Sequence, residues 1–364
     1  MAASRQDRFL QFVENPNNVK RILVIRNGLI GDTVFVTPVF ERLHESFPNA
    51  RLDVATSFKS VLLLKNYSHI NAVFSIPDKY SVKEHAKFFF SLRKFQYDIV
   101  IVQEVNSHYV LMAKLVMAKF LVGFENKLSF LLDFSVRRPQ GVHAVLAEIE
   151  AVQSWTGSTL PVATHLVISE EELKESENLL KANGVTNRDP IVCIHPGCSG
   201  KQSEREWVPE YYSELADSLI QNKKVRIVFT GVEQDRNLVE KIIAPMKYPS
   251  VSIIGKTNLR QLLGVLKISK IVIGPDTGTL HLANAVGTPV VMLCGSNDPS
   301  DTGPFDASGK SKFVRVDLPC IGCVRRYPKP KQWDICKNIR PVPCMEKLSP
   351  QIVYEATTEI LKDL

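Results

Sequence analysis

A run of small residues around one carboxylate, Pro275-Asp276-Thr277-Gly278, follows the apolar stretch at residues 270–274. An apolar helix is predicted to begin at about Thr279, which leaves backbone N–H groups without partners at its start. Such a start suits an anion, because free donors and the positive end of the helix dipole face the ligand. The pattern therefore favours a phosphate or diphosphate site, although Asp276 would also serve as an ordinary helix cap and His281 as a packed side chain.

A second acidic residue, Asp32, follows the predicted strand at residues 21–26 and the glycine pair Gly28-x-x-Gly31. This spacing differs from the GxGxxG of dinucleotide folds, so a nicotinamide cofactor is not indicated. Asp32 either caps a helix or lies in a loop at the carboxyl edge of the sheet, if the next helix starts near Pro38. Because open α/β sheets bind ligands at that edge, the second alternative makes Asp32 a candidate general base.

A third loop combines glycine with positive charge. The predicted strand at residues 191–195 runs into Gly197 and then, beyond a small-residue loop, reaches Arg205 and Trp207. Small residues allow a phosphate to approach the backbone, and an arginine supplies charge with two parallel donors.

These loops have to be positioned by the elements between them. Short apolar runs alternate with helical stretches along the whole chain, which is typical of βα units around a parallel sheet. The predicted strands are residues 21–26, 50–56, 72–76, 98–103 and 120–124, then 191–195, 225–231, 251–255, 270–274 and 288–295. Two series of five strands predict two doubly wound domains, with a charged helix at residues 167–183 near their boundary and a last helix at 349–364.

Taken in order, the motifs IRxxxIGDxxxxTP, HPG…REW, TGxEQDR and GPDTGTLHLANAxGTP resemble glycosyltransferase family 9, the ADP-heptose:lipopolysaccharide heptosyltransferases. The resemblance covers residues 20–298 and extends into the tail. It implies an α/β protein of GT-B fold, in which two Rossmann-like domains face each other across a cleft. We expect an acceptor-binding domain at residues 1–165 and a nucleotide-sugar-binding domain at 166–348, followed by the helix at 349–364.

The resemblance also implies roles for single residues. Asp32 matches the family's proposed catalytic base, and Arg205 falls where relatives often have a donor-contacting lysine. Asp235 falls where relatives have a glutamate near the donor nucleoside, and the nearby Glu233 is the alternative residue for that role. The remaining residues expected at the donor diphosphate are Asp276, Thr277, Gly278 and His281.

The activity that the resemblance implies is inverting transfer of a heptose from ADP-heptose to a lipopolysaccharide core or lipid A-type acceptor. No Asp-x-Asp occurs in the sequence, so we expect catalysis to need no metal cofactor. Two alternatives stay open. One is a transferase of the same family with another sugar nucleotide or with a protein or capsule acceptor, and the other is a non-catalytic assembly protein that binds sugar nucleotides.

Four of the seven cysteines form the pattern Cys320-x2-Cys323-x12-Cys336-x7-Cys344. Four soft ligands with a CxxC pair suit a structural zinc or iron ion. Reduced structural thiols and a redox or disulfide role remain alternatives to the metal. Some relatives in the resembled family also have cysteines in this tail, and in some of them these form an iron-binding finger. The spacing between the cysteines differs there.

The formal net charge of +7 belongs to one segment of the chain. Residues 310–347 contain ten basic and three acidic residues, so the other residues, with 35 of each sign, sum to zero. A basic segment on a neutral body favours docking to an anionic glycolipid at the inner membrane surface, and no nucleic-acid module is recognisable. No secretory signal or membrane-length apolar run occurs, so we expect a cytoplasmic protein, peripheral on the inner face of the membrane.

The overall composition excludes two further classes of protein. With 45% hydrophobic and 23% charged residues, the chain is neither globally disordered nor collagen-like.

Overall fold

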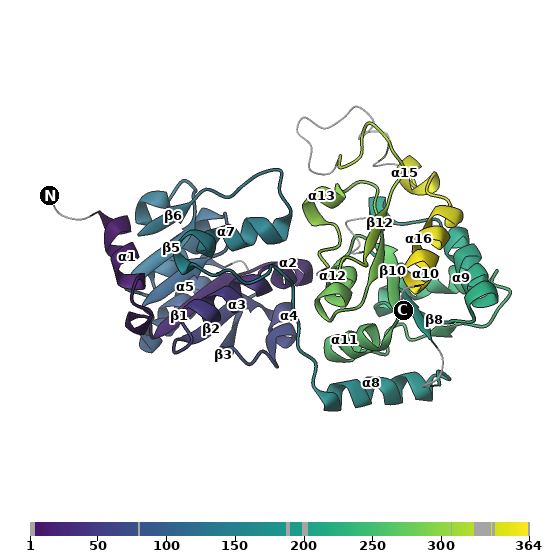
Figure 1. Cartoon of the computed structure of the whole chain (residues 1–364), viewed down its shortest axis with the longest axis horizontal. Helices are drawn as coiled ribbons and strands as arrows, with labels where there is room; N and C mark the ends of the chain where they lie inside the picture. The colour runs from purple at the N-terminus through teal and green to yellow at the C-terminus, as the bar shows by residue number, and fades with distance from the viewer. Residues whose placement is uncertain are drawn as a thin grey trace. The chain divides into compact units, whose positions relative to one another are not determined.

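The computed structural model describes residues 4–78, 81–186, 190–198, 203–306, 308–323, 336 and 339–362. The chain divides into two compact units, Met1–Val167 and Ile168–Leu364. Each unit contains one six-stranded sheet with helices around it (Figure 1). No helix in these described ranges is long and apolar enough to cross a membrane.

The first unit has the strand order β3-β2-β1-β4-β5-β6, with all neighbours parallel. Its strands are β1 (Arg21–Arg26), β2 (Arg51–Ser57), β3 (Ile70–Ile76), β4 (Ile99–Val102), β5 (Phe120–Phe124) and β6 (Phe134–Val136). Its helices are α1 (Arg5–Val13), α2 (Ile30–Phe35), α3 (Thr37–Ser46), α4 (Phe58–Val61), α5 (Val82–Leu92), α6 (Ser107–Lys114) and α7 (Ala144–Thr156). Short 3-10 turns are η1 (Pro16–Asn18), η2 (Leu62–Leu64), η3 (Arg93–Phe95) and η4 (Ser129–Leu131).

The second unit repeats this topology, with the order β12-β11-β10-β7-β8-β9 and parallel neighbours throughout. Its strands are β7 (Ile191–Ile194), β8 (Arg226–Phe229), β9 (Val251–Ser252), β10 (Ile271–Pro275), β11 (Val290–Leu293) and β12 (Lys312–Val314). Its helices are α8 (Glu170–Ala182), α9 (Pro209–Lys223), α10 (Arg236–Ile243), α11 (Leu259–Ile268), α12 (Gly278–Ala285), α13 (Pro299–Thr302), α15 (Pro343–Glu346) and α16 (Pro350–Lys362). Two 3-10 turns are η5 (Ser203–Arg205) and η6 (Glu233–Asp235).

The sequence-based expectation of two doubly wound α/β units is confirmed, and the strand count is corrected. The central strands β4, β7 and β11 are buried at every residue, because helices cover both faces of a parallel sheet. The strands that the sequence does not predict, β6 and β12, are edge strands of three residues each. Their apolar runs are too short to separate from loops.

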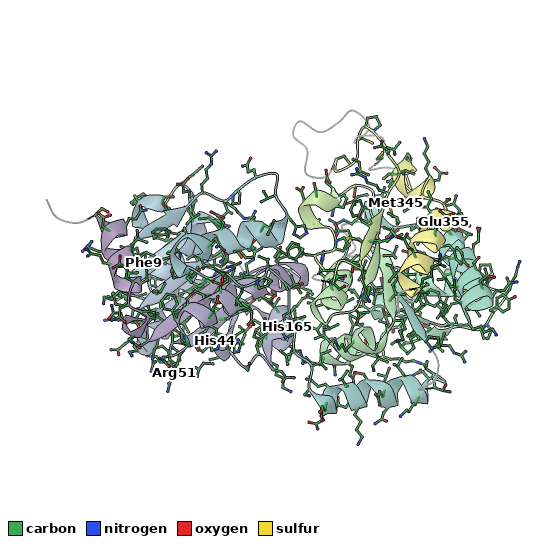
Figure 2. All side chains as sticks on the ribbon, viewed as in Figure 1. Phe9, His44, Arg51, His165, Met345 and Glu355 are labelled. Atoms are coloured by element: carbon green, nitrogen blue, oxygen red, sulfur yellow. The ribbon has the colours of Figure 1, made fainter. Side chains whose placement is uncertain are left out.

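Aromatic packing ties the chain's first helix to the sheet of the first unit. Phe9 of α1, labelled in Figure 2, is fully buried. Its ring centroid lies 5.1 Å from that of Phe134 and 5.1 Å from that of Trp155. Such aromatic pairs add stability beyond the area they bury, so α1 is an integral part of the first unit.

The helix that opens the second unit, α8, lies along α11 (Figure 1). Ser176 Oγ donates a hydrogen bond to the Gln261 carbonyl at 3.1 Å, and Arg260 Nε donates to Glu172 Oε1 at 2.8 Å. Gly264 permits this close approach, because a Cβ at its position would lie 2.0 Å from Ser176 Oγ.

We predict that Gly264→Ala destabilises the second unit by about 1–2 kcal/mol. Alanine gains about 1 kcal/mol of helix propensity over glycine, but the overlap with Ser176 costs more than this gain. Urea unfolding followed by circular dichroism measures the change. In a Ser176→Gly background the same substitution should be much milder, and an equal loss there would show that the contact is not the cause.

Candidate active site

The candidate residues follow the carboxyl ends of strands in both sheets. In the first unit β1 and β4 lie side by side, and in the second unit β7 and β10 do so. From each of these central pairs the chain adds strands first toward one edge of the sheet and then toward the other. Doubly wound sheets bind ligands at this point. Each unit is described by itself below.

Asp32 lies in the first turn of the short helix α2 and not in a loop, which corrects one of the two alternatives from the sequence. The neighbouring helix α3 begins at Thr37, next to Pro38 as expected. Asp32 Oδ2 accepts a hydrogen bond from the Leu29 backbone N–H at 2.8 Å, so it stabilises the start of α2. The side chain is still 39% exposed, so capping leaves the carboxylate accessible to a substrate.

A buried arginine fixes the other oxygen of that carboxylate. Arg26, the last residue of β1, donates from Nη2 to Asp32 Oδ1 at 3.2 Å. Its guanidinium also pairs with Glu104 and Glu148, each at 3.2 Å. Arg138 Nη2 donates at 2.8 Å to the same Glu148 oxygen, Oε1, that Arg26 contacts. Asp32 is therefore held on both oxygens, by a backbone donor and by Arg26.

Burial and the neighbouring charges act in opposite directions on the pKa values of Arg26 and Glu104. Burial raises the pKa of Glu104 to about 6, although the charge of Arg26 works against the shift. Burial alone would lower the pKa of Arg26, but Glu148, Glu104 and Asp32 together raise it. A permanently charged guanidinium thus stands among three carboxylates.

Sequence reasoning missed Arg26 and Glu104. Each carries a sequence signal, which is a charged residue at or just after the end of an apolar strand. Arg26 is the last residue of RILVIR, and Glu104 is the last residue of IVIVQE. Glu148 has no comparable signal, since it sits inside a helix and its role depends on packing.

In the second unit, Asp276 follows β10 directly and is buried. Its Oδ1 contacts His281 Nε2 at 3.3 Å, and its Oδ2 accepts hydrogen bonds from Thr302 Oγ1 at 3.1 Å and from Asn297 Nδ2. Its carbonyl accepts from Arg205 Nη1 at 2.6 Å. The structure therefore brings Arg205 and His281, both named from the sequence, into contact with Asp276. The Asp276 carboxylate itself is held by His281, Thr302 and Asn297.

These partners keep the Asp276 carboxylate ionised. Burial works to raise its pKa, but His281, Arg205 and Asn297 outweigh burial and lower the pKa to about 2. Asp276 is thus a buried, charged residue that holds its neighbours in place. The next residue, Thr277, is the N-cap of α12 and makes no side-chain capping bond.

Several buried polar atoms beside Asp276 have no hydrogen-bond partner among the described residues. They are Thr277 Oγ1, Arg205 Nε, Ser296 Oγ and Asn297 Oδ1. Buried polar groups in proteins are nearly always paired, and three of these four atoms can donate. Together with the backbone N–H groups of Gly278 and Thr279 at the start of α12, they form a set of donors suited to an anion.

His195, which the sequence analysis did not select, connects this turn to the next strand. Its Nε2 lies 3.1 Å from Thr279 Oγ1, and its Nδ1 lies 3.2 Å from Thr230 Oγ1. Burial lowers the pKa of His195. Its carbonyl passes so close to β10 that a Cβ on Gly274 would lie 2.3 Å away, which explains the glycine in IVIGPDTG.

Of the two acidic residues in TGVEQDR, Asp235 packs against two glycines and Glu233 against one, Gly255. A Cβ on Gly197 or Gly231 would lie 2.5 or 2.6 Å from the Asp235 carboxylate. Asp235 Oδ2 accepts the Val232 N–H at 2.9 Å, whereas Glu233 forms an exposed pair with Arg236 at 2.7 Å. The geometry therefore favours Asp235 over Glu233 as the residue that faces the site.

All seven cysteines are free thiols. Burial raises the pKa of Cys344 to about 12, and Cys323, Cys320 and Cys336 add to the shift. Among the described residues no three His, Cys, Asp or Glu side chains are arranged to hold a metal ion. The predicted basic segment, 310–347, lies partly outside the described residues, and its Arg325, Arg326, Lys329 and Lys331 are all among those not described.

A family model described as glycosyltransferase family 9 (heptosyltransferase) matches residues 85–333, more than half of the chain. The protein belongs to glycosyltransferase family 9. It is 26% identical over 305 residues to the lipopolysaccharide core heptosyltransferase OpsX of Haemophilus influenzae, covering 81% of this chain and 84% of the relative. It is 22% identical over 357 residues to lipopolysaccharide heptosyltransferase 2 of Salmonella typhimurium, covering 94% and 99%.

Solved structures agree on the fold of this glycosyltransferase. The family 9 transferase from Veillonella parvula matches with a TM-score of 0.81 and 19% identity, covering 95% of this chain and 98% of that one. The ADP-heptose lipopolysaccharide heptosyltransferase II of E. coli matches with a TM-score of 0.76 and 21% identity, covering 94% and 99%. A more distant match is the dodecameric iron-containing heptosyltransferase TibC, with a TM-score of 0.55 and 14% identity, covering 95% and 77%. The family and the GT-B fold class expected from the sequence are confirmed.

We predict that Asp276→Asn lowers the stability of the second unit at pH 7 by about 2 kcal/mol, because a carboxyl whose pKa falls from 3.8 to about 2 favours the folded state. Since the folded pKa is the lower one, this contribution is present above pH 4 and lost between about pH 4 and pH 1. Urea unfolding at several pH values measures it.

The control for this prediction is Asp317→Asn at an exposed position without a hydrogen-bond partner in the described part of the chain. The stability difference between wild type and Asp276→Asn should shrink in acid, whereas Asp317→Asn should differ little from wild type throughout. A difference that stays constant down to pH 2 would contradict the role of the charge.

Proposed function

We propose that this family 9 glycosyltransferase moves a heptose or a related sugar from an ADP-sugar to a lipopolysaccharide core or lipid A-type acceptor, with inversion at the anomeric carbon. The observation that carries the proposal is the group of unpartnered donors around Asp276: Thr277 Oγ1, Ser296 Oγ and Arg205 Nε. They suit a diphosphate, the anionic part of a nucleotide sugar. Relatives named as lipopolysaccharide heptosyltransferases support the heptose and the acceptor.

The donor-binding residues would also stabilise the leaving group. When the bond between the anomeric carbon and the diphosphate breaks, its electron pair stays on the diphosphate oxygen. Donors that are already oriented stabilise such a charge without reorganising. Arg205 is held in place by its bond to the Asp276 carbonyl, and the N-terminus of α12 adds its N–H groups, so these groups supply the stabilisation.

Asp32 is the base in this proposal. The acceptor hydroxyl attacks the anomeric carbon opposite the departing diphosphate, forms the new carbon–oxygen bond, and gives its proton to the Asp32 carboxylate. Hydrogen bonds from Leu29 and Arg26 orient that carboxylate before the substrate arrives. The acceptor would be a glycolipid precursor, so we place the reaction at the cytoplasmic face of the membrane.

We predict that Asp32→Asn lowers the rate of sugar transfer by about 10²- to 10⁴-fold, the usual contribution of a general base, and leaves donor binding nearly unchanged. Transfer from ADP-heptose is followed by mass spectrometry of the acceptor. Donor binding is measured by calorimetry against ADP-, GDP- and UDP-sugars.

The matched control is Glu104→Gln, a second carboxylate on Arg26 whose side chain is mostly buried, at 13% exposure. It should keep most of the activity. Loss of transfer in Glu104→Gln with retention in Asp32→Asn would reverse the assignment of the base. Tight binding of a GDP- or UDP-sugar, with no binding of an ADP-sugar, would assign a different donor nucleotide to the same site.

We further propose that Cys320, Cys323, Cys336 and Cys344 hold a structural zinc or iron ion. The ligand type fits, because four thiolates suit both metals, but in this structure the described cysteines are not gathered around an ion, so binding would have to draw them together. Cys336 and Cys344 also pack against the core of the second unit. The ion would fasten the tail to that core and has no part in the transfer step.

We predict that the purified protein contains about one equivalent of zinc or iron, and that Cys344→Ser loses it, because one thiolate of four is removed. Elemental analysis by mass spectrometry after purification under reducing conditions checks this. Cys198→Ser, outside the cluster, should keep the metal, and wild-type protein without bound metal would end the proposal.

A further inference from the structure

Two helices and a turn cover one face of the sheet in the first unit. Phe89 and Leu92 of α5, and Val110 and Ala113 of α6, join one buried cluster with the strands. Leu131 of η4 packs against the same cluster. These elements also contact one another, α5 with α6 and α6 with η4, so their outer sides form a continuous surface.

The outer side of α5 combines positive charge with an exposed ring. Lys83, Lys87 and Phe90 are exposed and follow one another at spacings of four and three residues, which places them on one side of the helix. Arg93 and Lys94 extend this side into η3, and the Arg93 guanidinium lies 5.9 Å from the centre of the Phe90 ring. Among the described residues none of these four cations pairs with a carboxylate.

Further large apolar side chains are exposed next to this side. We call the whole region the α5–α6 surface. Its exposed apolar residues are Val82, Phe90, Leu111, Met117 and Phe130, each between 49% and 70% exposed. Its basic residues are Lys83, Lys87, Arg93, Lys94, Lys114 and Lys127, against the acidic Glu84 and Glu125. Apolar residues gathered at one surface of a protein mark an interaction site.

We propose that the α5–α6 surface docks onto an anionic phospholipid bilayer. Basic side chains attract the negative leaflet, and Phe90, Leu111, Met117 and Phe130 would enter the headgroup boundary, as in interfacial helices. The charge argues against a second copy of the chain, because a two-fold interface would bring two identical basic surfaces together. The proposal does not depend on the transferase function, since docking needs neither donor nor acceptor.

The proposal is tested by sedimentation of the full chain with vesicles of phosphatidylethanolamine and phosphatidylglycerol. We expect binding that weakens as salt is added and that is much weaker on neutral phosphatidylcholine. Removing two cations with Lys83→Gln and Lys87→Gln should weaken binding by about 20-fold. Phe90→Ser, which keeps every charge, should weaken it by about tenfold.

Matched controls change the same side-chain types elsewhere. Lys174→Gln with Lys181→Gln on the exposed side of α8, and Ile352→Ser on α16, should bind vesicles like wild type. All substituted residues are exposed, so the variants should keep the wild-type melting temperature.

Three results would overturn the proposal. The first is no binding to anionic vesicles, and the second is binding that both α5 variants retain in full. The third is binding that Arg325→Ser with Arg326→Ser abolishes while the α5 variants retain it, because the C-terminal basic segment would then be the docking element. Sedimentation velocity adds a check, since a dimer that Phe90→Ser dissociates, without vesicle binding, would assign the surface to self-association.

Discussion

The cost of burying a charge shapes both halves of this transferase. An ionised group taken out of water is stable only when partners replace its hydration. The second unit buries the Asp276 carboxylate at the end of β10, and it recruits His281, Asn297 and Thr302 from three different segments. The first unit buries the Arg26 guanidinium at the end of β1 and surrounds it with carboxylates. Each buried charge therefore organises the loops at its own sheet edge.

This constraint also separates the roles of neighbouring residues in the second unit. An ionised carboxylate repels a diphosphate, so Asp276 does not suit direct contact with the donor. Its side chain is occupied by three partners, and its carbonyl holds Arg205. What remains for an anion is the surrounding set of donors, on Thr277, Ser296 and Arg205. In the proposed mechanism Asp276 therefore positions the donors of the anion site.

The sequence predicted those parts of the site that depend on local chemistry. Asp32 and Asp276 stand out because each follows an apolar strand and is flanked by small residues. Glu148 does not, because its importance comes from its contact with Arg26, which joins β1 and α7 only after folding. The strands β6 and β12 were missed for a related reason. Three residues carry too little periodicity, and only the neighbouring strand makes them part of a sheet.

The charged and apolar residues of the first unit form a distinct surface only when their positions around the α5 helix are considered. Summed along the sequence, everything outside residues 310–347 is neutral, and the run Phe88-Phe89-Phe90 looks like ordinary core. Successive residues on a helix point about 100° apart, so α5 buries Phe89 and exposes Phe90. The same rotation places Lys83 and Lys87 beside Phe90, and Glu84 is the one acidic residue of α5. A neutral total therefore conceals a basic, apolar surface that only the three-dimensional arrangement of α5 and α6 creates.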